Sequence, residues 1–91
     1  MEHAHVNLSE QDRSLINSTL DISCKFIDNE QFTLALNILH EVEKKFWYIP
    51  EILFNIGISN YLNAKKSFEK EDFTNAEYFF LIAEKYLIKS I

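Results

Sequence analysis

The side chains of this sequence that are best suited to hold a metal ion gather at its amino terminus. The segment "EHAH" contains Glu2, His3 and His5, and His40 is the only other histidine. A zinc site needs three or four ligands held in a fixed geometry. Residues 1–8 show no apolar periodicity, so we expect a flexible tail that cannot supply such rigidity. The sequence therefore predicts no metal site and no cofactor.

The remaining candidates for chemistry are one cysteine and a pair of glutamates. Cys24 lies between Ser23 and Lys25 in a segment with helical apolar spacing, where no neighbouring base is in place to activate it as a nucleophile. A small side chain that packs or lines a groove fits this position better. Glu41 and Glu43 point about 200° apart around a helix and cannot act as a pair. We therefore expect a protein that is not an enzyme.

The composition limits the class of protein. The 91 residues are 47% hydrophobic and 14% aromatic with one glycine and one proline, which favours a single all-α domain over residues 9–91. The net charge of −5 argues against binding nucleic acid. One cysteine fits a reducing compartment, and the first residues do not resemble a signal peptide. The most apolar segment, residues 76–91, contains four charges, so we expect no membrane span and a cytoplasmic protein.

The spacing of apolar residues predicts four helices. The first covers about residues 9–27 and opens with Ser9 and Asp12, a variant of the capping box. The second runs from about residue 32 to 47, the third from Pro50 to about residue 70, and the last begins near residue 72. Proline suits the first turn of a helix because its missing amide hydrogen is not needed there. Short polar connectors then give two antiparallel helical hairpins.

The last predicted helix is apolar on more than one side. Its expected core stripe consists of Phe73, Ala76, Phe80, Ala83 and Leu87. The four consecutive residues 79–82 are all apolar and cannot all face one partner helix, which indicates a surface for association. We assign that association surface to Phe79, Leu81, Ile82, Tyr86 and Ile88.

The two halves of the sequence match at a fixed offset. Aligning Ser23 with Gly57 gives an offset of 34 residues, which also matches Ile22 with Ile56. The segments "FTLALNILHEV" and "FTNAEYFFLIA" show the same rhythm of large and small apolar residues. Over about residues 16–88 the sequence resembles the tetratricopeptide repeat (TPR) family, with Ile56 and Gly57 in place of its Leu-Gly pair.

The second half departs from the family pattern in length. Gly57 to Ala76 spans 19 residues, whereas Ser23 to Ala35 spans 12. The seven extra residues amount to about two helical turns. We therefore expect a second repeat with an elongated first helix, or an enlarged connector. The glycine is expected to let the adjoining helix approach where a side chain would push it away.

The resemblance implies a groove that binds protein segments. In TPR-like stacks the first helix of each pair lines a concave groove, which maps here to Leu20, Cys24, Ile27, Phe54, Asn55, Ile58 and Tyr61. Family members that hold acidic chaperone tails use a clamp of Lys, Asn and Arg, but Leu20 and Cys24 stand where Lys and Asn would be expected. An apolar or amphipathic segment is therefore implied, oriented by hydrogen bonds from Asn55 and Tyr61. Ordinary packing between helices is the alternative role for Leu20, Ile58 and Tyr61.

Two functional hypotheses follow. The first is a non-catalytic protein–protein interaction module, an adaptor or small chaperone that binds a peptide or helix of a partner protein. The second is a structural subunit that forms a homodimer or a heteromer through its apolar last helix and has no client groove. Two repeats rarely suffice for an independent solenoid, which favours a partner that covers the last helix.

Overall fold

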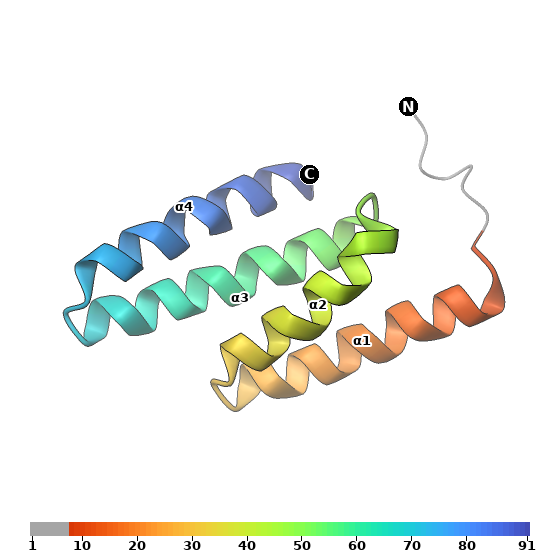
Figure 1. Cartoon of the computed structure of the whole chain (residues 1–91), viewed down its shortest axis with the longest axis horizontal. Coiled ribbons are helices and arrows are strands. Elements are labelled where there is room, and N and C mark those ends of the chain that lie inside the picture. The colour runs from red at the N-terminus through yellow and green to blue at the C-terminus, as the bar shows by residue number, and fades with distance from the viewer. Residues whose placement is uncertain (1–7) are drawn as a thin grey trace.

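Residues 8–91 fold into four α-helices joined by short connectors (Figure 1). A computed structural model describes residues 8–91, and its helices are α1 (Glu10–Asp28), α2 (Phe32–Phe46), α3 (Pro50–Glu69) and α4 (Phe73–Lys89). The all-α prediction of two antiparallel hairpins is confirmed. The predicted helix ends lie about one residue from those observed.

Local side chains explain where two of the helices begin. The Ser9 hydroxyl accepts a hydrogen bond from the Asp12 amide at 3.0 Å, as the predicted cap requires. At the start of α4, the Asp72 carboxylate accepts a hydrogen bond from the Asn75 amide at 3.4 Å. These bonds satisfy amides of the first helical turn that have no partner within the helix.

The two hairpins turn with the same backbone geometry. Glu30 and Glu71 have positive φ angles of 59° and 62° and end α1 and α3 in the left-handed conformation. The amide after each glutamate donates to the carbonyl five residues earlier, at 2.8 Å in the first turn and 2.9 Å in the second. The turns lie 41 residues apart, which is seven more than the 34-residue offset. The seven extra residues therefore belong to α3 and not to the connector.

The added residues lengthen only the second part of α3. The whole of α3 has 20 residues and α1 has 19. The two lengths are similar because α3 begins at Pro50, only a short distance before Gly57, so its part before the glycine is short. After Gly57, α3 and its partner α4 extend past the turn between α1 and α2 (Figure 1). The molecule measures 45 × 28 × 16 Å, so its helices form a flat body.

The main core lies between α1, α2 and α3. Its buried members are Ile16, Leu39, Val42, Phe46, Ile52 and Ile56. Phe46 is the largest fully buried side chain, with 1% of its surface exposed. Leu8, which the sequence pattern placed in the tail, packs against this cluster.

The core stripe predicted for α4 is only partly correct. Ala76 and Ala83 are buried, whereas Phe73 and Phe80 are 56% and 39% exposed. Among the described helices, the backbone of α4 packs closely against α3 alone. Small residues occupy the line of closest approach between these two helices, and the bulky aromatic rings lie at its edges.

Candidate functional site

One face of α3 is left uncovered by the other helices that the structure describes. The residues on this face recur every three or four positions along the helix. They are Phe54, Ile58, Tyr61, Lys65 and Phe68. Phe54, Tyr61 and Phe68 are 48%, 43% and 57% exposed, and Ile58 is half-buried. Large apolar side chains in a continuous row on an uncovered helix face indicate a surface for association.

An apolar hollow of about 460 Å³ lies between this face and α4. It is lined by Tyr61, Phe80, Ala83, Glu84, Leu87, Ile88 and Ile91. We name the hollow together with the exposed face of α3 the α3–α4 groove. Its residues are Phe54, Ile58, Tyr61 and Phe68 from α3 and Phe73, Phe80, Leu87, Ile88 and Ile91 from α4 and the carboxyl terminus.

Gly57 sets the distance between the two helices that form the groove. A Cβ atom at this position would lie 2.8 Å from Cγ and Cδ2 of Leu87 and 3.2 Å from its backbone nitrogen. Any side chain here would therefore displace the Leu87 side chain or the backbone of α4. The glycine allows the close approach of the adjoining helix that the sequence predicted, and it brings Leu87 to the floor of the groove.

Two pairs of aromatic rings join the walls of the groove. The ring centroids of Tyr61 and Phe80 lie 5.8 Å apart, and those of Phe68 and Phe73 lie 5.3 Å apart. Such pairs contribute about 0.5–1.5 kcal/mol beyond their buried area. The second pair flanks the turn between α3 and α4, and the first lies near the middle of the two helices.

The structure brings together the predicted site residues of α3 with one exception. Phe54, Ile58 and Tyr61 share the exposed face, whereas Asn55 lies about 100° around the helix from Phe54. The Asn55 amide donates a hydrogen bond to the carbonyl of Glu51 at 2.8 Å. Its side chain is therefore held by its own helix.

The predicted site residues of α1 do not join this groove. Leu20 lines a separate hollow of about 360 Å³ together with Ile16 and Ile49. Cys24 is exposed, and Ile27 is half-buried. Because α1 packs on the side of α3 away from α4, the single groove expected across both first helices is divided (Figure 1).

The sequence pattern missed the contribution of α4 to the groove. Phe80 and Leu87 were assigned to the core, and Ile91 was not assigned. A signal was present, because Glu77 and Glu84 share one helix face with Phe80 and Ile88. Charged residues within an apolar stripe are typical of a face that remains in contact with water.

The association surface predicted on α4 is divided between exposed and internal residues. Leu81 and Ile88 are 61% and 62% exposed. Phe79 and Ile82 are half-buried, and Tyr86 makes contacts with α2. Only part of the predicted surface is therefore open to a partner.

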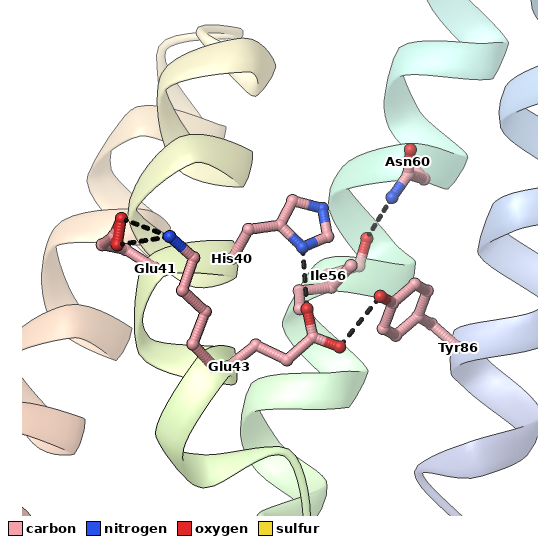
Figure 2. A network of polar contacts seen from close by, with 7 residues as sticks. His40, Glu41, Glu43, Ile56, Asn60 and Tyr86 are labelled. Carbon is pink, nitrogen blue, oxygen red and sulfur yellow. Dashed lines mark hydrogen bonds and ion pairs between the residues drawn. The ribbon is translucent and has the colours of Figure 1, made fainter.

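A polar cluster links α4 to α2 (Figure 2). The Tyr86 hydroxyl donates to Oε2 of Glu43 at 2.9 Å, and Oε1 of Glu43 lies 2.8 Å from Nδ1 of His40. The pKa of Tyr86 is raised to about 12. The largest cause is burial of the tyrosine, and the hydrogen bond to Glu43 and the negative charge of the Glu43 carboxylate add to it. Each group in the cluster has a structural partner, and together they fasten the second hairpin to the first.

We expect Tyr86→Phe to destabilise the fold by about 1 kcal/mol at neutral pH, because Glu43 loses a partly buried hydrogen bond. The raised pKa adds a pH dependence, since the unfolded tyrosine ionises near pH 10 and the folded one near 12. Its stabilising contribution is thus complete below pH 10 and is lost as the pH rises to 12. Urea unfolding at pH 8 and 11 measures both effects.

The exposed Tyr78 provides the matched control for this measurement. Tyr78→Phe should leave the free energy of unfolding at pH 8 nearly unchanged. Between pH 8 and 11 this variant should lose as much stability as the wild-type chain does. If Tyr86→Phe loses stability between pH 8 and 11 by as much as the wild-type chain does, the link between α4 and α2 is not as described.

Within residues 8–91, no three side chains of His, Cys, Asp or Glu are grouped so that they could hold a metal ion. Glu2, His3 and His5 lie outside the described residues. In the same part of the chain, no helix combines the length and the apolar character needed to span a bilayer.

Comparison with known proteins gives no relative of this chain. No family model, no curated protein and no solved structure matches it.

Proposed function

We propose that this chain is a non-catalytic protein–protein interaction module, an adaptor or small chaperone of the cytoplasm, which binds an apolar or amphipathic segment of a partner protein. The single observation that carries this proposal is the α3–α4 groove. Its apolar side chains are exposed or half-buried in a row along α3 and α4, and no other described helix covers that row. Burying them against a partner is the favourable step that the surface provides.

We further propose that the two hairpins are TPR-like repeats. The 34-residue offset between Ser23 and Gly57, and the 41-residue offset between two turns of the same geometry, support this interpretation. Both offsets agree with one ancestral hairpin that was extended by two helical turns in its second copy. The exposed face of α3 then corresponds to part of the surface that the first helices line in such repeats, and α4 adds a wall that the family pattern does not include.

The affinity expected from the groove is moderate. A large apolar side chain contributes about 1.5–3 kcal/mol when it is fully buried. Three or four such side chains must also offset the cost of association, which is at least about 4 kcal/mol. We therefore expect dissociation constants between the millimolar and the micromolar range.

Substitution of Ile88 tests the proposed groove. We expect Ile88→Asn to weaken binding of a fluorescein-labelled Leu- and Lys-containing amphipathic helical peptide by about tenfold, because an apolar side chain in the hollow is lost. Anisotropy titration measures the affinity. Ile22→Asn is the matched control, since Ile22 has similar exposure, 46%, but lies on α1. Equal effects of the two substitutions would contradict the proposed site.

The alternative function is that of a structural subunit that associates through α4. The high exposure of Leu81 and Ile88 favours this candidate. Size-exclusion chromatography with light scattering distinguishes the two functions. A monomer that binds the peptide supports the groove, and a salt-insensitive dimer that ignores the peptide supports the structural subunit.

A further inference from the structure

We propose that the partner segment of the α3–α4 groove is a basic amphipathic helix, whose lysine or arginine side chains pair with Glu77 and Glu84. This inference rests on the proposed function and adds the chemistry of the partner. It follows from the charges that accompany the apolar surface, from the length of the groove and from the net charge of the chain.

The two acidic side chains lie on the groove face of α4. Glu84 lines the hollow, and Glu77 precedes it by seven residues, so both lie on the same face about 10 Å apart along the helix. Both are exposed, and neither forms an ion pair with any of residues 8–91. Two unpaired carboxylates beside an apolar hollow favour a ligand that is both apolar and cationic.

The dimensions of the groove fit a helix. From Phe54 to Phe68 the exposed face of α3 extends over 14 residues, or about 21 Å. A partner helix of similar length has four turns and presents apolar residues at a spacing of three and four, which matches the spacing of Phe54, Ile58 and Tyr61. An amphipathic helix can thus place its apolar face in the hollow and its charged edge over α4.

The basic residues near the groove define the orientation of the partner. Lys65 lies on the face of α3, opposite the acidic row of α4. Lys85 follows Glu84 but points about 100° around α4, away from the groove. The basic edge of the partner therefore lies over α4, and its edge near α3 is neutral or acidic.

The same charges disfavour the other occupants of the groove. A second copy of the chain would bring together two molecules of net charge −5. An anionic membrane surface would likewise be repelled by Glu77 and Glu84. A cationic helix is attracted both by these carboxylates and by the net charge of the whole chain.

Three synthetic 16-residue peptides test this inference. They share leucines at helical spacing and carry either lysine, glutamine or glutamate at two positions seven residues apart on one edge. In anisotropy titrations at low salt, we expect the lysine peptide to bind about fivefold more tightly than the glutamine peptide, and the glutamate peptide to bind most weakly. In 0.5 M NaCl the three affinities should converge.

Charge-neutralising variants locate the effect. Glu77→Gln with Glu84→Gln should reduce binding of the lysine peptide to that of the glutamine peptide and leave the latter unchanged. The control variant combines Glu10→Gln on α1 with Glu41→Gln on α2, which changes the net charge by the same amount away from the groove. Its effect on binding of the lysine peptide should be much smaller.

The outcomes separate this inference from the proposed function. Equal binding of the lysine and glutamine peptides, with both weakened by Ile88→Asn, would refute the basic partner and retain the groove. Failure of all three peptides to bind a monomeric chain would refute both. A stable dimer that excludes every peptide would show that the occupant is a second copy and would also overturn the inference.

Discussion

Gly57→Leu is expected to destabilise the protein by about 3 kcal/mol or more, because the new side chain would enter the space occupied by Leu87. A Cβ atom alone would lie 2.8 Å from two carbon atoms of Leu87 and 3.2 Å from its backbone nitrogen. Overpacking of this kind usually costs about 1–3 kcal/mol and more when backbone must move. Urea unfolding followed by far-ultraviolet circular dichroism measures the change. Leucine is a good helix former, so the loss cannot be attributed to helix propensity.

A double-mutant cycle identifies the contact responsible for this effect. Gly57→Ala combined with Leu87→Ala should be less destabilised than the sum of the two single variants, because shortening Leu87 makes room for the new methyl group. Additive effects would show that position 57 is not limited by Leu87. The close approach of α4 to α3 would then need another explanation.

Phe46→Ala is expected to cost about 3–5 kcal/mol, since Phe46 is 1% exposed and lies in the core between α1, α2 and α3. In a domain of this size such a loss approaches the whole free energy of unfolding. Thermal unfolding should show a decrease in Tm of more than about 10 °C or no cooperative transition.

The adjacent Trp47 provides a matched control, because it is 64% exposed. Trp47→Ala should change the free energy of unfolding by less than about 1 kcal/mol. If both aromatic residues can be removed at similar cost, the core does not lie where the structure places it.

The helices and their ends could be predicted from the sequence because their signals are local. Ser9 and Asp12 define the first cap, and Pro50 fits the first turn of α3. Ala35, Leu39 and Val42 recur every three or four residues, a spacing that indicates the buried face of a helix, and all three are buried. Each of these signals depends on residues within one or two turns of the same helix.

The periodicity of α4 does not show which of its apolar side chains are buried and which are exposed. Phe73 and Phe80 fall on the same helical stripe as the buried Ala76 and Ala83. Their exposure depends on how closely α4 approaches α3 and on the lack of another described helix against that edge. These are properties of the packing and not of a single helix. The local indication is that Glu77 and Glu84 lie on the same helix face as Phe80.

Three of the residues predicted for a groove share one face of α3, and those predicted on α1 lie apart from them. Phe54, Ile58 and Tyr61 lie on one exposed face as the repeat pattern indicated. The pattern assigned the second wall to Leu20 and Cys24 of α1, whereas the hollow opens toward α4. The hollow lies between Tyr61 of α3 and the carboxyl-terminal half of α4, and the packing of two helices against each other cannot be deduced from the spacing within one of them.

The proposed binding site is tested most directly by mapping amide chemical shifts of the ¹⁵N-labelled chain during titration with the lysine peptide. The largest changes are expected at Ile58, Tyr61, Glu84 and Ile88, with α1 nearly unaffected. Changes confined to α1 or to the outer face of α2, with the α3–α4 groove unperturbed, would contradict the proposed function.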